Sequence, residues 1–91
     1  MNFNIQATRQ YDKDVKLAKK RGLDVNKLIE IVVKLANDEV LPVKNHDHGL
    51  TGNYEGYREC HVSPDWLLIY KKTEEIKLIT LVRTGTHSDL F

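Results

Sequence analysis

Three segments of strand length follow one another in the second half of the sequence, and the links between them constrain the fold more than any other feature. The segments span about residues 56–62, 66–72 and 76–83, and the links read only "SPD" and "TEE". Links this short can join antiparallel neighbours, whereas parallel strands need a crossover of about a dozen residues or more. We therefore predict an antiparallel meander, with the apolar run Trp66–Tyr70 as its buried strand.

The first half of the sequence predicts one short strand and two helices. Residues 3–7, "FNIQA", alternate between apolar and polar side chains, as a half-buried strand does. Thr8 and Asp24 are suited to cap the helices, and Gly22 lies where the first helix should end. The apolar stripes expected on the two helices are Tyr11, Val15 and Ala18, and Leu28, Ile29, Val32, Leu35 and Ala36. The second helix is expected to run to about Asp38, and the short link makes the pair an antiparallel hairpin.

Together these elements predict a single domain of the α+β class over residues 1–91, in the order β-α-α-β-β-β. The helical hairpin is expected to pack on one face of a four-stranded, mainly antiparallel sheet. Because antiparallel sheets tolerate one solvated face, the opposite face is free to be a functional surface. Residues 41–56 are rich in Gly and Asx residues and contain Pro42, which predicts a long polar loop.

The composition excludes several classes of protein. With 41% hydrophobic and 30% charged residues, the chain is globular rather than disordered. Cys60 is its only cysteine, which rules out an internal disulfide and a cysteine-rich zinc site. The sequence has neither a signal-peptide pattern nor an apolar run long enough to span a bilayer, so we expect a cytoplasmic protein with no membrane partner.

The net charge is only +1, but the cations are unevenly distributed. Residues 1–45 hold nine Lys and Arg against six Asp and Glu, whereas residues 46–91 hold five against seven. The cations that crowd the first helix are Lys13, Lys16, Lys19, Lys20 and Arg21. Such a basic face attracts nucleic acid or an acidic partner, and it is equally consistent with a solvated helix face balanced by Asp12 and Asp14.

Histidines and acids gather around the predicted meander. Period-two alternation places Glu59 and His61 on one face of their strand, while His48 precedes the sheet and His87 follows it. The residues expected to share a face of the last strand are Lys77, Ile79, Leu81 and Arg83. Three interpretations of the histidines are open: a metal site built on His46 and His48, surface hydrogen bonding, and metal-free acid–base chemistry.

The acid–base interpretation fits the cleavage of RNA by its own 2′-hydroxyl. That reaction needs a base at the hydroxyl, an acid at the leaving 5′-oxygen and a cation at the phosphoryl oxygens. Histidine suits either proton-transfer role because its ordinary pKa lies near neutrality, and the arginine fork suits a phosphate. The candidates for these roles and for orienting an imidazole are His48, His61, His87, Glu59, Asp65 and Arg83.

Two motifs, "DHGLTG…GYRECHVSPDWLLIY" and the final "RTGTHSDLF", resemble the YafQ branch of the RelE toxins, which are bacterial messenger-RNA endonucleases. The resemblance spans essentially the whole chain and implies a RelE-like fold. The residues that match the family's active-site positions are His48, His61, Asp65, His87 and Phe91. The resemblance also implies that His87 is the general acid, that Arg83 contacts phosphate, and that Glu59 stands where the family usually has Asp.

The same resemblance implies a toxin of a type II toxin–antitoxin system that cleaves messenger RNA in the ribosomal A site. Cleavage would proceed through a 2′,3′-cyclic phosphate with no metal or cofactor. A cognate antitoxin would silence the toxin, and operator DNA would be contacted only through the antitoxin complex. Lys16 and Lys20 are then candidate contacts for RNA or for the antitoxin. Many relatives are strongly basic, whereas this chain has a net charge of +1.

Two other functions stay open at this level. ParE toxins resemble the same fold and inhibit gyrase without cutting RNA, and a decayed nuclease could persist as an antitoxin-bound repressor. The histidines favour the nuclease, because a pure binder needs no such set of acid–base groups. Phe91 could either stack on a substrate base or pack the tail, and Asp65 could serve the turn as well as the site.

Overall fold

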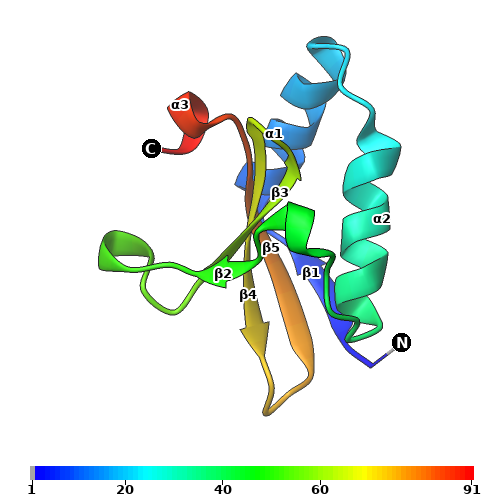
Figure 1. Cartoon of the computed structure of the whole chain (residues 1–91), viewed down its shortest axis with the longest axis vertical. Coiled ribbons are helices and arrows are strands. Elements are labelled where there is room, and N and C mark those ends of the chain that lie inside the picture. The colour runs from blue at the N-terminus through cyan, green and yellow to red at the C-terminus, as the bar shows by residue number, and fades with distance from the viewer. Residues whose placement is uncertain (1) are drawn as a thin grey trace.

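The computed structural model describes residues 2–91 and contains a five-stranded sheet, two twelve-residue helices and a short C-terminal helix (Figure 1). In chain order the elements are β1 (Asn4–Ala7), α1 (Arg9–Lys20), α2 (Val25–Ala36), η1 (Val43–Asn45), β2 (His48–Gly49), η2 (Gly52–Tyr54), β3 (Arg58–Ser63), β4 (Trp66–Thr73), β5 (Leu78–Gly85) and α3 (His87–Leu90). Within residues 2–91, no helix has the length and apolarity needed to cross a membrane.

The strands lie in the order β1-β5-β4-β3-β2. β1 runs parallel to β5, and every other neighbouring pair is antiparallel. In Figure 1, α1 and α2 lie together on one side of the sheet, while α3 and β2 lie toward the other. The predicted α+β class, the meander and the helical hairpin on one face are confirmed. The sheet has one strand more than the four predicted, because the two residues of β2, inside the predicted polar loop, pair with β3.

The two helices begin where the sequence predicts them to begin. The Thr8 hydroxyl accepts the backbone N–H of Tyr11 at 3.0 Å, and the Asp24 carboxylate accepts the N–H of Asn26 at 3.0 Å. α2 ends at Ala36, two residues before the predicted end. The buried face of α2 differs from the predicted stripe at two residues. Ile31 is buried, whereas Ile29 is 52% exposed.

Both faces of β4 are covered, which is why its first five residues, 66–70, are all buried. Leu68 and Tyr70 pack with Cys60 of β3 and the helical hairpin. Leu67 and Ile69 face the other way. The side chains that pack on them come from the loop after β2, from β5 and from α3: Leu50, Tyr54, Tyr57, Val82 and Leu90.

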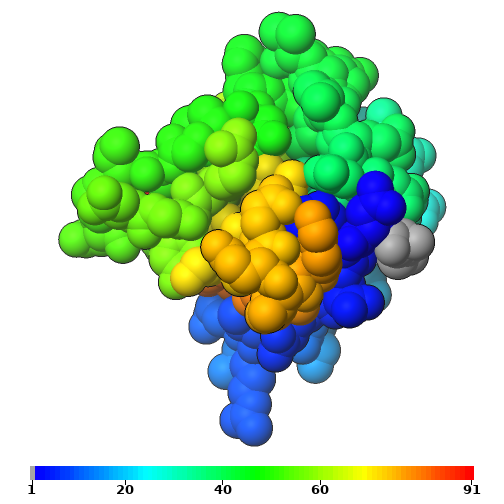
Figure 2. Space-filling view, turned by 90° about the horizontal axis from the view of Figure 1, so that it is seen from below, coloured from blue at the N-terminus to red at the C-terminus, as the bar shows by residue number. Residues whose placement is uncertain are grey.

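The face away from the helical hairpin is therefore not the bare surface that the sequence suggests. The segment that contains β2 and η2 extends beyond the sheet on one side and covers part of this face. Figure 2 shows this segment in green, projecting beside the yellow and orange end of the β4–β5 hairpin. Beside the covered part, His61 of β3 approaches His87 of α3, with 5.7 Å between the ring centroids.

A β-bulge near the end of β5 decides on which face Arg83 lies. Tyr70 pairs with Leu81, but the preceding residue Ile69 pairs with Arg83, so that Val82 is the extra residue. Ile69 packs on the face away from the helical hairpin. Arg83, as the partner of Ile69, therefore extends from that face, whereas Leu81 packs on the side of the helical hairpin. The strict alternation that predicts a shared face for Leu81 and Arg83 is wrong at this point.

The carboxylate of Asp14 is buried where α1 packs against β5. It accepts hydrogen bonds from Arg83 Nε at 2.8 Å and Nη2 at 3.2 Å, and from the Thr84 backbone N–H at 3.1 Å. Gln10 Nε2 donates a fourth bond at 3.1 Å. A buried carboxylate is tolerated when its desolvation is offset in this way by charge and hydrogen bonds. Asp14 thereby fixes the position of α1 along β5.

Replacing Asp14 with Asn should destabilise the fold. The variant turns an amide N–H toward donors that lose their charged acceptor, so the free energy of unfolding should fall by about 2–4 kcal/mol. Urea denaturation measures the change. Asp12→Asn, at an exposed position of the same helix, is the matched control and should cost less than about 1 kcal/mol. Equal losses in the two variants would contradict the anchoring role of Asp14.

Candidate active site

Five of the predicted site residues come together at the edge of the sheet away from β1. His48 lies on β2, Glu59 and His61 lie on β3, Asp65 lies in the β3–β4 turn, and His87 begins α3. The sheet register explains the first contact, because His48 is paired directly with Glu59. The approach of α3 to the β3–β4 turn supplies the rest.

Glu59 is the buried centre of this group, with a side chain only 7% exposed. Its Oε1 lies 3.6 Å from Nε2 of His48 and 3.8 Å from Nε2 of His61. A carboxylate between two imidazoles can accept a hydrogen bond from either ring. It can also balance the positive charge that a ring acquires when it takes up a proton.

The ring of His48 is oriented by the backbone of its own loop. Its Nδ1 donates to the carbonyl oxygen of His46 at 2.6 Å, and His46 adopts a left-handed conformation with φ of 46°. A neutral ring that donates from Nδ1 keeps the lone pair on Nε2. This tautomer, assigned from the hydrogen bond, gives His48 a basic nitrogen on a half-exposed side chain.

His87 is oriented by Asp65. One carboxylate oxygen, Oδ1, accepts both the His87 backbone N–H at 3.0 Å and ring Nδ1 at 2.6 Å. The backbone hydrogen bond, with the ring bond second, lowers the pKa of Asp65 below its ordinary value, so the carboxylate is ionised at neutral pH. With Nδ1 turned to Asp65, the other ring nitrogen, Nε2, is the atom left to exchange a proton with a substrate.

The imidazole rings form a row across these elements. The centroids of His46 and His61 lie 5.2 Å apart, and those of His61 and His87 lie 5.7 Å apart, both edge to face. Asn45 fixes the loop beside this row, because its buried side-chain amide donates to the carbonyl of His61 at 2.7 Å. No group of three or more His, Cys, Asp or Glu side chains among residues 2–91 is arranged to hold a metal ion.

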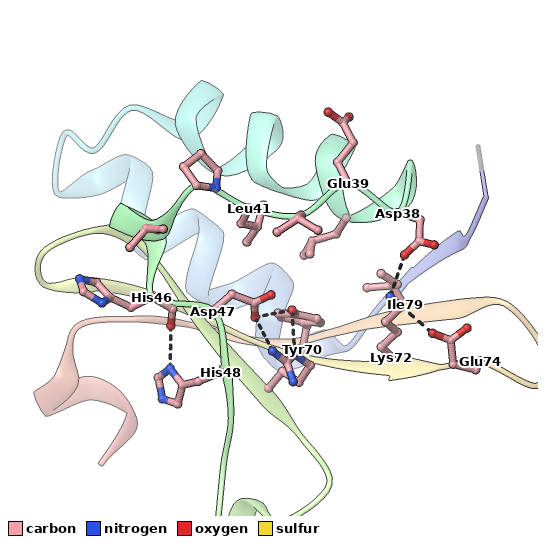
Figure 3. A pocket seen from close by; sticks show the side chains of 15 residues that line it. Asp38, Glu39, Leu41, His46, Asp47, His48, Tyr70, Lys72, Glu74 and Ile79 are labelled. Atoms are coloured by element: carbon pink, nitrogen blue, oxygen red, sulfur yellow. Dashed lines mark hydrogen bonds and ion pairs between the residues drawn. The ribbon is translucent and has the colours of Figure 1, made fainter.

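A groove lies between the end of α2 and strands β3 and β4, next to the segment that carries His46 and His48 (Figure 3). Asp47 points into it toward Tyr70, whereas His46 and His48 point away. The Tyr70 hydroxyl donates to Asp47 at 2.6 Å, and Arg58 Nη2 lies 3.3 Å from the same carboxylate oxygen. Burial, followed by the Asp47 hydrogen bond, raises the pKa of Tyr70, so the hydroxyl keeps its proton. These contacts hold the loop from which His48 projects.

Arg83 lies near the end of β5, and Phe91 follows α3. The bonds to Asp14 occupy Nε and Nη2 of Arg83, which leaves Nη1 for a further acceptor. The Asp14 hydrogen bond raises the pKa of Arg83, and nearby Tyr54 raises it further. The Phe91 ring is 63% exposed and meets the edge of the Tyr54 ring at 5.6 Å between centroids.

Other predicted residues are placed differently. Lys16 and Lys20 are exposed on α1, on the face of the sheet opposite the histidines, and do not join the cluster.

The sequence did not predict the structural roles of Asp14, Asn45 and Tyr54. Asp14 carried a signal, because it lies on the apolar stripe of α1. Tyr54 carried one too, as an aromatic residue in a polar loop, whereas nothing in the sequence marked Asn45.

The arrangement matches that of known proteins. Residues 3–91 match the family model described as "Bacterial toxin of type II toxin-antitoxin system, YafQ". The chain is 51% identical over 89 residues to the mRNA interferase toxin YafQ of Escherichia coli strain K12, and the match covers 97% of this chain and 95% of that protein.

Solved structures agree. A chain in the crystal structure of the E. coli DinJ-YafQ toxin-antitoxin complex matches with a TM-score of 0.89 and 49% identity, over 100% of this chain and 99% of that one. The metal-bound toxin from Helicobacter pylori matches with a TM-score of 0.91 and 39% identity, over 98% and 99% of the two chains. The protein therefore belongs to the YafQ family of bacterial toxins from type II toxin–antitoxin systems.

Proposed function

We propose that this protein is an endoribonuclease that cleaves messenger RNA and inhibits translation until an antitoxin neutralises it. The observation that carries the proposal is the meeting of imidazoles and carboxylates at one sheet edge. Glu59 lies within 3.8 Å of His48 and of His61, and Asp65 lies 2.6 Å from His87. The name of the E. coli relative, mRNA interferase toxin, supports the same activity.

The reaction is a transesterification within the RNA strand. His48 Nε2 takes the proton of the 2′-hydroxyl, whose oxygen then forms a bond to phosphorus. The bond from phosphorus to the 5′-oxygen breaks, and His87 gives that leaving oxygen a proton. The products are a 2′,3′-cyclic phosphate and a 5′-hydroxyl. Glu59 balances charge on His48 and His61, and Arg83 Nη1 contacts the phosphoryl oxygens.

Base stacking positions the substrate in this proposal. The exposed Phe91 ring follows His87 by one helical turn, and the Phe91 N–H donates to the His87 carbonyl at 2.9 Å. Leu90 is buried and fixes the tail to the sheet, so the Phe91 ring is held outward. A base stacked there would place its phosphate between the acid and the base, a contact of roughly 1–3 kcal/mol.

The partners follow from the family. A cognate antitoxin would silence the toxin, as DinJ pairs with YafQ in the E. coli complex, and operator DNA would be bound only through that complex. Lys16 and Lys20 on α1 are proposed contacts of an acidic antitoxin segment or of RNA. Cleavage is proposed to occur on translating ribosomes in the cytoplasm. Neither a gyrase inhibitor nor a decayed repressor would need the oriented imidazoles of His48 and His87.

In vitro translation with primer-extension mapping tests the function, since discrete cuts in the message separate a nuclease from a binder. On isolated RNA, we expect cleavage to persist in excess chelator and to leave cyclic or 3′-phosphate ends, because the proton transfers use imidazoles alone. The H. pylori relative binds a metal, which makes this control informative. Activity lost with chelator and restored by one particular divalent ion would contradict metal-free catalysis.

His87→Gln should slow cleavage without unfolding the protein. Removing a proton-transfer group costs about 10²–10⁴-fold in rate, so we expect a loss of at least about tenfold. The melting temperature and antitoxin affinity should stay near wild type, because the side chain is 55% exposed. Ser88→Ala, at the next exposed position of α3, is the control and should cleave normally. A His87→Gln variant that cleaves normally, or fails only by unfolding, removes His87 from the mechanism.

Deleting Phe91 should reduce single-turnover cleavage by about ten- to a hundredfold through loss of positioning, with little change in the unfolding midpoint. Phe91→Tyr keeps an aromatic face and should retain most of the activity. The opposite result would assign the ring to the core instead. In that case the deletion lowers the unfolding midpoint, and activity falls only in proportion to the unfolded fraction.

A further inference from the structure

The helix that bears His87 is too short to be stable without outside contacts. α3 contains four residues, His87–Leu90, and an isolated helix shorter than about 12 residues is marginal in water. His87 starts this helix and Phe91 follows it, so two proposed functional groups depend on where four residues settle. The contacts that hold α3 therefore decide whether the site is assembled.

The side chain of Asp89 closes the helix on itself. Its Oδ2 accepts the Thr86 N–H at 3.0 Å, while the Thr86 hydroxyl accepts the Asp89 N–H at 3.1 Å. This reciprocal pair is a capping box, which satisfies backbone donors at the helix start. It gives α3 its local shape, but it does not attach the helix to the rest of the protein.

Buried Leu90 and the bonds from His87 to Asp65 hold α3 against the sheet and the β3–β4 turn, and Arg21 attaches it to α1. Arg21 caps the C-terminal end of α1, and its guanidinium meets the Asp89 carboxylate with two bonds, Nη1 to Oδ2 at 2.6 Å and Nη2 to Oδ1 at 3.2 Å. The Arg21 bond lowers the pKa of Asp89 well below its ordinary range, and the Asp89 bond raises the pKa of Arg21. Both groups are charged at neutral pH, and a two-bond fork fixes direction as well as distance.

Gly85 allows Asp89 to sit where Arg21 can reach it. A Cβ atom at Gly85 would lie 2.9 Å from Oδ2 and 3.0 Å from Cβ of Asp89, closer than such atoms approach. The Asp89 side chain thus rests against the backbone at the end of β5. The end of β5, the end of α1 and α3 therefore meet at the Asp89 carboxylate.

We infer that Arg21 and Asp89 are positioning residues, which hold α3 so that His87 and Phe91 face the substrate. This inference rests on the proposed nuclease function. Neither residue lies in the histidine cluster, and the pair acts on the reaction only through α3. The Arg21 side chain is 41% exposed, and exposed ion pairs contribute little to folding stability. Placement matters more, because an error of about 1 Å in a reacting group can cost roughly a hundredfold in rate.

The test compares single-turnover RNA cleavage by Arg21→Gln, Asp89→Asn and the double variant. The cleavage rate of each single variant should fall about tenfold. The double variant should be no slower than the slower single variant, because both substitutions remove the same interaction. Arg21→Lys should recover part of the rate, since lysine keeps the charge without the planar fork. Lys27→Gln removes the same charge from an exposed site on α2 and should cleave at the wild-type rate.

A second readout does not depend on cleavage. In Arg21→Gln, the amide protons of Leu90 and Phe91 should exchange with solvent faster and the His87 ring resonances should shift, while the melting temperature stays near wild type. Gly85→Ala should produce the same pattern by displacing Asp89 without a change of charge.

The two readouts separate the possible failures. Wild-type protein that does not cut RNA would refute the proposed function and leave the exchange data to judge the positioning of α3. Variants that cut at the wild-type rate, or that lose activity only in step with their melting temperature, would overturn the inference.

Discussion

One buried carboxylate joins the two halves of this chain. Asp14 accepts four hydrogen bonds, of which Arg83 and the backbone of Thr84 donate three. A desolvated carboxylate tolerates few other geometries, so α1 is fixed in position along β5. The end of α1 then brings Arg21 to Asp89, and α3 is held in turn. The same bonds hold the Arg83 side chain against α1.

The site is assembled from elements that could not persist alone, which suits a reaction that depends on placement. β2 has two residues and α3 has four. Side-chain contacts replace the missing backbone pairing: Asp47 is held by Tyr70 and Arg58, and Asp65 receives two bonds from His87. The first contact fixes the loop that precedes His48, and the second fixes the orientation of the His87 ring. Preorganised charge of this kind lowers a barrier without reorganisation during the reaction.

The sequence predicted what depends on local pattern and missed what depends on single contacts. Helix caps, the meander and the histidine candidates all follow from periodicity, turn residues or family motifs, and the elements lie within about two residues of their predicted bounds. The short strand β2 could not be predicted, because two residues give no alternation. The bulge at Val82 reverses the face of Arg83 through one unpaired residue, which a period-two pattern cannot reveal. The Arg21–Asp89 bond joins residues 68 positions apart, and in a single sequence both read as ordinary surface charges.

The order of the strands sets the time at which the sheet of this molecule can be completed. β1 pairs with β5, and Arg83, which bonds to Asp14, follows it by 69 residues in the chain. At about 5–20 residues per second, synthesis separates the two by roughly 3–14 s. During that interval α1 has no strand to pack on, and contacts between such distant residues form late because loop closure opposes them. The acid–base site comes last of all, since His87 follows β5. The candidate site is therefore incomplete until residues 87–91 have been made and β5 has joined the sheet.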